Sequence, residues 1–197
     1  MVLGRTLEDL AAEVDRLGAE TRALALLAAA ERWRGVFSLF DRRARLSPGL
    51  TEVLDETWEL FSTLEELPRL AQLMDARVPG ERWAVDGLVD SVTQDCANLL
   101  MGALEFKAGE GDGTPEWSPF DLLRTLLCQE WHGATDLGSG AEDEAFEARL
   151  VGDVRFHDEL DFLREALRRA PNGAVDLSEY RTWAASRSVD VSGFSAL

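Results

Sequence analysis

The chain has 197 residues, of which 46% are hydrophobic and 29% charged, so it is long and apolar enough to bury the core of one globular domain. This composition excludes disordered, collagen-like and low-complexity classes of protein. Acidic residues outnumber basic ones 37 to 20 and give a net charge of -17, so the phosphates of a nucleic acid or an anionic membrane would repel most of the surface. We therefore expect neither nucleic acid nor membrane among the partners.

The sequence predicts neither a membrane span nor a signal peptide, because no run of about 18 apolar residues is present and no basic stretch followed by an apolar one opens the chain. Cys96 and Cys128 lie in apolar helical runs without CxxC spacing, which is typical of reduced, buried thiols. A single lysine, Lys107, combined with abundant alanine, leucine and glycine, is typical of a GC-rich bacterial genome. We expect a cytoplasmic bacterial protein.

Apolar residues recur at helical spacing through almost the whole chain, and no segment alternates long enough to form a strand. The sequence therefore predicts an all-α fold, a compact single-domain bundle of about seven to eight helices. In chain order, the expected helices span roughly residues 6–18, 20–43, 48–62, 64–76, 82–107, 118–132 and 141–170, followed by a short helix that Asp176 caps.

Three of these expected helices carry further detail. Residues 20–43 are apolar nearly all round in their first half, which is typical of a central helix. Pro48 is expected at the first helical position of its helix. The apolar face of residues 141–170 changes phase, which predicts a break near Gly152.

The predicted domain spans residues 1–187, and residues 188–197 are expected to form a C-terminal tail. Within the domain, residues 108–117 are rich in glycine and acidic side chains. This composition predicts an exposed loop inside one domain.

Three short motifs within residues 20–107 follow the helix order and spacing of one known family. They are the Glu31-Arg32 pair in a helix that ends with Phe40, the Trp58-Glu59 step after a proline-glycine turn, and Asp95-Cys96 in the long middle helix. In these motifs the chain resembles the YjaG-like bacterial family, a domain of unknown function, with a weak likeness beyond residue 107. The resemblance implies a compact helical bundle and carries over no activity, cofactor or catalytic residue.

Two arrangements around histidine would carry chemistry, and each has a structural alternative. Cys128 and His132 lie four residues apart, so one helix face would present an activated thiol; we favour a buried thiol and a histidine at a helix C-terminus. Asp153, His157 and Asp161 share a helix face and would form a weak divalent-metal site; we favour a surface histidine among solvated acids. We predict no metal and no cofactor, and we assign no catalytic residue.

Glu31 lies on the apolar side of the expected central helix. A buried carboxylate requires a cationic partner, which Arg32, Arg34 or an arginine from elsewhere in the chain would supply. We therefore identify Glu31 and Arg32 as candidate buried charges. A structural ion pair is the favoured interpretation, and an acid in a functional pocket is the alternative.

The acids of residues 48–62 occupy about a third of the helix circumference, opposite the apolar side; they are Glu52, Asp55, Glu56 and Glu59. Glu65 and Glu66 continue the run. Such a face is commonly only solvated, but a net charge of -17 far exceeds the magnitude of about 2 to 8 that suffices for solubility. The excess favours a basic protein partner, and Trp117, beside the 108–117 loop, is the tryptophan expected at the interface.

Two hypotheses of function follow. The first is a protein that acts by protein–protein binding through Glu52, Asp55, Glu56, Glu59 and Trp117, as an immunity or regulatory factor against a basic partner. The alternative is a metal-dependent hydrolase that uses His132, His157 and nearby carboxylates. The sequence lacks a complete catalytic set, so it favours binding over catalysis.

Overall fold

The structure of the protein is a computed structural model, and it describes residues 16–78, 88–109, 140–170 and 175–192, together with the single positions 12, 14, 123 and 127. The described residues contain helices and no strand, which confirms the all-α prediction. The helices are α2 (Ala19–Arg32), α3 (Arg34–Ala44), α4 (Leu50–Leu60), the short 3-10 helix η1 (Leu64–Glu66), α5 (Leu67–Asp75), α6 (Leu88–Ala108), α8 (Gly140–Val151), α9 (Val154–Arg169) and α10 (Leu177–Ser186).

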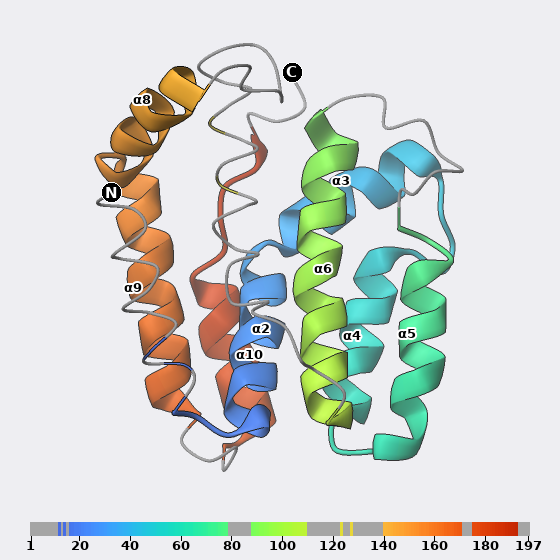
Figure 1. Ribbon diagram of the computed structural model, residues 1–197. Helices are drawn as coiled ribbons and strands as arrows, with labels where there is room; N and C mark the ends of the chain where they lie inside the picture. The colour runs from blue at the N-terminus through green and yellow to red at the C-terminus, as the bar shows by residue number, and fades with distance from the viewer. Residues whose placement is uncertain are drawn as a thin grey trace.

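Two helices, α2 and α6, lie side by side at the centre of the bundle (Figure 1). Helices α3, α4 and α5 lie on one side of this pair, and α9 and α10 lie on the other. Every residue from Ala23 to Ala30 is buried, which confirms the prediction that this segment is central. The many alanines of α2 let the neighbouring helices approach closely, so the core forms around this helix.

The segment 20–43 is not one continuous helix, because α2 ends at Arg32 and α3 begins at Arg34. In a continuous helix the carbonyl of Arg32 would accept a hydrogen bond from the N–H of Val36. Here the N–H of Val36 bonds instead to the carbonyl of Trp33 at 2.9 Å, and the Arg32 carbonyl accepts from the N–H of Val189 at 3.0 Å. The segment that follows α10 therefore takes the place of a helical hydrogen bond at the α2–α3 break.

The same segment packs closely on the break through Val191. A Cβ atom at Gly35 would lie 2.6 Å from Cγ2 of Val191, so only glycine leaves room for this contact. Val189 and Val191 are partly buried against the core. Residues 189–191, within the segment expected as a tail, thus cover the α2–α3 junction.

Helix α4 begins at Leu50, with Gly49 as the preceding N-cap residue, so Pro48 precedes the cap and is not the first helical residue. The reason is a carboxylate from α3: Asp41 accepts hydrogen bonds from the N–H groups of Leu50 and Thr51 at 2.7 and 2.9 Å. A Cβ at Gly49 would lie 2.4 Å from Cγ of Asp41. The side chain of Asp41 therefore caps α4 across the turn.

The predicted break near Gly152 is confirmed, because α8 ends at Val151 and α9 begins at Val154. Asp153 caps α9 by accepting a hydrogen bond from the N–H of Arg155 at 2.8 Å. The predicted cap of the short helix is also confirmed: Asp176 accepts from two N–H groups of α10 at 2.9 and 3.0 Å.

Several expected elements lie partly or wholly outside the described residues. They include the first helix, the start of the helix expected at residue 82, most of the 108–117 loop, and the 118–132 helix apart from Leu123 and Leu127, which are buried. Within the described part of the chain, no helix combines the length and the apolar composition needed to cross a membrane.

Replacing Gly49 with alanine should destabilise the protein, because the new methyl group would displace the Asp41 carboxylate from the first N–H groups of α4. We expect the free energy of unfolding to fall by about 1 to 2 kcal/mol, the usual effect of losing an N-cap. Gly18→Ala is the matched control, since Gly18 is also an N-cap residue and nothing lies within 4 Å of its Cβ position. Urea denaturation followed by tryptophan fluorescence measures both variants, and equal losses would contradict the capping role of Asp41.

Candidate functional site

Two adjacent and oppositely charged residues, Glu31 and Arg32, are buried at the end of α2. This confirms the prediction that both are buried charges. They belong to separate polar clusters. Glu31 contacts side chains of α3, α4 and α10, whereas Arg32 contacts α9 and the segment after α10.

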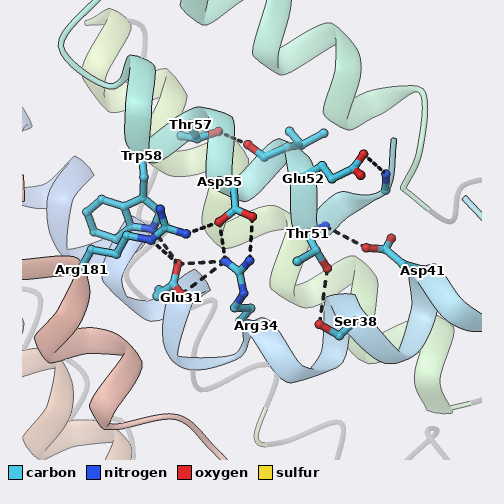
Figure 2. A network of polar contacts seen from close by, with 12 residues as sticks. Glu31, Arg34, Ser38, Asp41, Thr51, Glu52, Asp55, Thr57, Trp58 and Arg181 are labelled. Atoms are coloured by element: carbon cyan, nitrogen blue, oxygen red, sulfur yellow. Dashed lines mark hydrogen bonds and ion pairs between the residues drawn. The ribbon is translucent and has the colours of Figure 1, made fainter. Parts of the chain in front are cut away.

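The carboxylate of Glu31 is only 3% exposed and lies between three donors (Figure 2). The indole N–H of Trp58 donates to its Oε2 at 2.8 Å. The guanidinium groups of Arg34 and Arg181 lie at 3.4 and 3.5 Å. Each oxygen of this buried carboxylate therefore has at least one donor, as a charge inside a protein requires.

Asp55, which is partly exposed, contacts the same two arginines (Figure 2). Arg34 forms a bidentate pair with it, with N···O distances of 2.9 and 2.8 Å, and Arg181 donates to the same carboxylate. Partial burial by itself raises the pKa of Asp55, but the hydrogen bonds and charges of Arg34 and Arg181 outweigh it, so the pKa is lowered below its ordinary value. Two acids and two arginines thus balance in charge and connect α3, α4 and α10 to the end of α2.

The second cluster pairs Arg32 with Glu159 of α9 at 2.9 Å. Trp33 also donates its indole N–H to Glu159, at 3.4 Å, and Arg32 donates to the backbone carbonyl of Arg187. Burial raises the pKa of Glu159, and the charge and hydrogen bond of Arg32 oppose that effect without cancelling it. This pair fixes α9 and the segment after α10 against α2.

The acids predicted as one partner-binding face have different environments. Glu52 accepts a hydrogen bond from the backbone N–H of Gly49 at 3.1 Å, and Asp55 is held by the two arginines. Glu56 forms an ion pair with Arg69 at 3.2 Å. Glu59 is exposed and forms no ion pair with any described residue. Trp117, the fifth predicted residue, lies outside the described residues.

Glu59 is followed in the chain by two further exposed residues in η1, Leu64 and Glu65. We call these three residues, Glu59, Leu64 and Glu65, the η1 surface. Glu65 is exposed and, like Glu59, has no cationic partner in the described parts of the chain. Leu64 is 59% exposed. The η1 surface therefore combines an exposed apolar side chain with uncompensated negative charge.

The metal site weighed as an alternative on α9 does not assemble among the described residues. His157 and Asp161 are exposed, and Asp153 is bound to Arg155 at 2.9 Å. No group of three or more His, Cys, Asp or Glu side chains in the described ranges is placed to hold a metal ion. His132 and Cys128 lie outside those ranges, so the hydrolase remains a hypothesis.

Cys96 is fully buried in α6, as predicted. Burial is the main cause that raises the pKa of its thiol well above the ordinary value. A thiol in this environment stays protonated, so Cys96 is a core residue and not a nucleophile.

Sequence reasoning identified Glu31 and Arg32 but missed their partners Glu159 and Arg181. For Glu159 a signal exists, because it lies on the same helical stripe as the buried Phe156 and Leu163. An acid on an apolar stripe indicates a buried charge. Arg181 carries no comparable signal in the sequence.

Comparison of the chain with protein-family models, with curated proteins and with solved structures finds no match in any of the three. The resemblance to the YjaG-like family stays a prediction.

The Arg32–Glu159 pair should behave as a structural ion pair in a double-mutant cycle. Arg32→Met should lower the free energy of unfolding by about 3 to 5 kcal/mol, because it leaves the Glu159 carboxylate buried without its partner. The double variant Arg32→Met/Glu159→Leu should lose much less, since it removes both charges. Chemical denaturation measures the free energy of unfolding of Arg32→Met, of Glu159→Leu and of the double variant. If the loss of the double variant equals the sum of the losses of the two single variants, the two side chains do not form a pair.

Asp55→Asn should flatten the acid limb of the stability profile. Because the folded state lowers the pKa of Asp55 below 3.8, this carboxylate stabilises the protein above that value and loses its contribution as the pH falls through the folded pKa. The variant should therefore be less stable at neutral pH and less sensitive to acid. Thermal unfolding between pH 7 and 3 tests this, with Asp161→Asn, which changes an exposed acid on α9, as the control.

Proposed function

We propose that the protein acts by binding a basic protein partner, and that the η1 surface is part of the interface. The observation that carries this proposal is the exposed Leu64, which lies next to Glu65 and a few residues after Glu59, both without a cationic partner in the described ranges. A large apolar side chain exposed among acids suits an anchor that is buried when a basic surface docks around it.

The charge around this anchor supports the same conclusion. Residues 50–78, which contain α4, η1 and α5, carry seven acidic and two basic side chains. One of the two arginines, Arg69, is already shared between Glu56 and Glu66, at 3.2 and 2.7 Å. The remaining negative field would accelerate the association of a basic protein and repel acidic competitors.

A small acidic protein with such a surface fits the role of an immunity or regulatory factor, which inhibits a basic partner by covering its positively charged site. The proposed kinship with the YjaG-like family is compatible with this role and adds no activity to it. A cytoplasmic location remains part of the proposal.

Neutralising the η1 surface should weaken retention of the partner. The tagged protein is used to capture proteins from a lysate of its own host, and bound proteins are eluted with a salt gradient. We expect a basic protein to be retained by the wild type and to elute at lower salt from Glu59→Gln/Glu65→Gln, because fewer ionic contacts remain to be screened. Leu64→Ala should also weaken retention, although it leaves the charge unchanged. For an anchor that contributes roughly 1.4 kcal/mol, we expect the affinity for the partner to fall by about tenfold.

The matched control is Asp158→Asn/Asp161→Asn, which removes the same charge from exposed positions on α9. Its elution profile should equal that of the wild type. Equal shifts in both double variants would show capture by net charge alone, and the η1 surface would then have no specific role.

A further inference from the structure

A groove of about 330 Å³ lies along the surface between α5 and α6. Its polar lining is Asp75, Gln94, Asn98 and Glu105. Asp75 and Glu105 are exposed, and neither has an ion-pair partner among the described residues. Among the described residues, the lining contains no basic side chain.

Four lining residues of α6, from Gln94 through Asn98 and Met101 to Glu105, follow one another at spacings of four, three and four, so they form one face of this helix, and Ala97 also lines the groove. The other side of α6 packs against α2 and α3. At a rise of about 1.5 Å per residue, the face from Gln94 to Glu105 is about 16 Å long. The groove is therefore an elongated feature of about three helical turns.

Helices α5 and α6 run antiparallel (Figure 1), with Leu70 and Leu104 packed in one apolar cluster. Asp75, at the end of α5, consequently lies toward the Gln94 end of the groove, and Glu105 lies toward the other end. Between the two carboxylates the floor is apolar, made by Ala97 and Met101. A complementary ligand would carry positive charge at both ends and a small apolar surface between them.

We propose that this groove receives an amphipathic helix of the basic partner, so the inference rests on the function proposed above. Basic side chains seven to eleven residues apart, about 10 to 16 Å along such a helix, would fit within the length of the α6 face that lines the groove. Apolar side chains between them would pack on Ala97 and Met101. The volume of the groove accommodates a few side chains of one helix face.

The position of the groove next to the η1 surface supports the proposal that a helix of the basic partner binds there. The Glu105 end of the groove lies beside the start of α5, where Leu67 packs with Leu104, and α5 follows η1 directly. A helix in the groove would therefore bring neighbouring parts of the same partner to Leu64. The groove and the η1 surface would then belong to one interface.

The test uses a fluorescently labelled alanine-rich helical peptide of 18 residues, with arginines at positions 4, 11 and 15 and leucines on the same face. A second peptide has the same composition with the arginines on the opposite face from the leucines. Fluorescence anisotropy measures the binding of each to the full-length protein. We expect the first peptide to bind at least about tenfold more tightly than the second, because only the first places apolar and basic groups together.

Two groups of variants locate the peptide. Asn98→Trp fills the groove from an exposed position without changing the charge, and should reduce affinity by about tenfold or more while the melting temperature stays unchanged. Asp75→Asn/Glu105→Gln should reduce affinity by roughly three- to tenfold and weaken its salt dependence. The control Asp158→Asn/Asp161→Asn should change affinity less than twofold.

Equal binding of the two peptides, or equal binding to the wild type and Asn98→Trp, would overturn the assignment of the groove. A concentration-dependent dimer in sedimentation that Asn98→Trp dissociates would assign the groove to a second copy of the chain, and would also overturn it. Failure of the proposed function is distinct, because no basic protein would then be retained from the lysate. If a basic protein is retained and Asn98→Trp leaves its retention unchanged, only the assignment of the groove is overturned.

Discussion

The fold is built around the need to neutralise two opposite charges, Glu31 and Arg32, that adjoin each other at the end of a buried helix. Taking either charge out of water costs several kcal/mol unless a partner of opposite sign and further hydrogen bonds replace the solvent. Because consecutive helical residues point in different directions, one partner cannot serve both. The arginines of α3 and α10 meet Glu31, and Glu159 of α9 meets Arg32, so three helices are positioned by one dipeptide.

The same logic explains which acids remain available for binding. A large share of the described carboxylates act inside the fold: Asp41 and Asp176 cap helices, while Asp55 and Glu159 hold arginines. A net charge of -17 therefore overstates the number of acids free to meet a partner. The unpaired ones around η1 and in the α5–α6 groove differ because no arginine reaches them within the described structure. Their negative potential is uncompensated, as the proposed binding surface requires.

The sequence predicts well the features that depend on neighbouring residues. Helical periodicity gives the all-α fold, a change of phase gives the break near Gly152, and an aspartate before a helix gives the cap of α10. Prediction from the sequence fails where contacts between residues that are distant in the chain determine the local structure. The α2–α3 break depends on a backbone bond from Val189, and the start of α4 depends on a carboxylate of α3. The burial of Glu31 can be predicted because it lies on the apolar side of its helix. The pairing of Glu31 with Arg181 cannot, because it depends on how α10 packs against α2.

The distance along the chain between the paired charges affects how the protein can fold. Arg32 and Glu159 are separated by 127 positions, and Asp55 and Arg181 by 126. During synthesis α2 leaves the ribosome long before α9 and α10 exist, so its terminal charges stay hydrated and the central helices cannot close into a finished core. Contacts between such distant residues also slow the search for the native state. Formation of the complete core is therefore a late event, and partly synthesised chains leave apolar helix faces exposed, which favours aggregation.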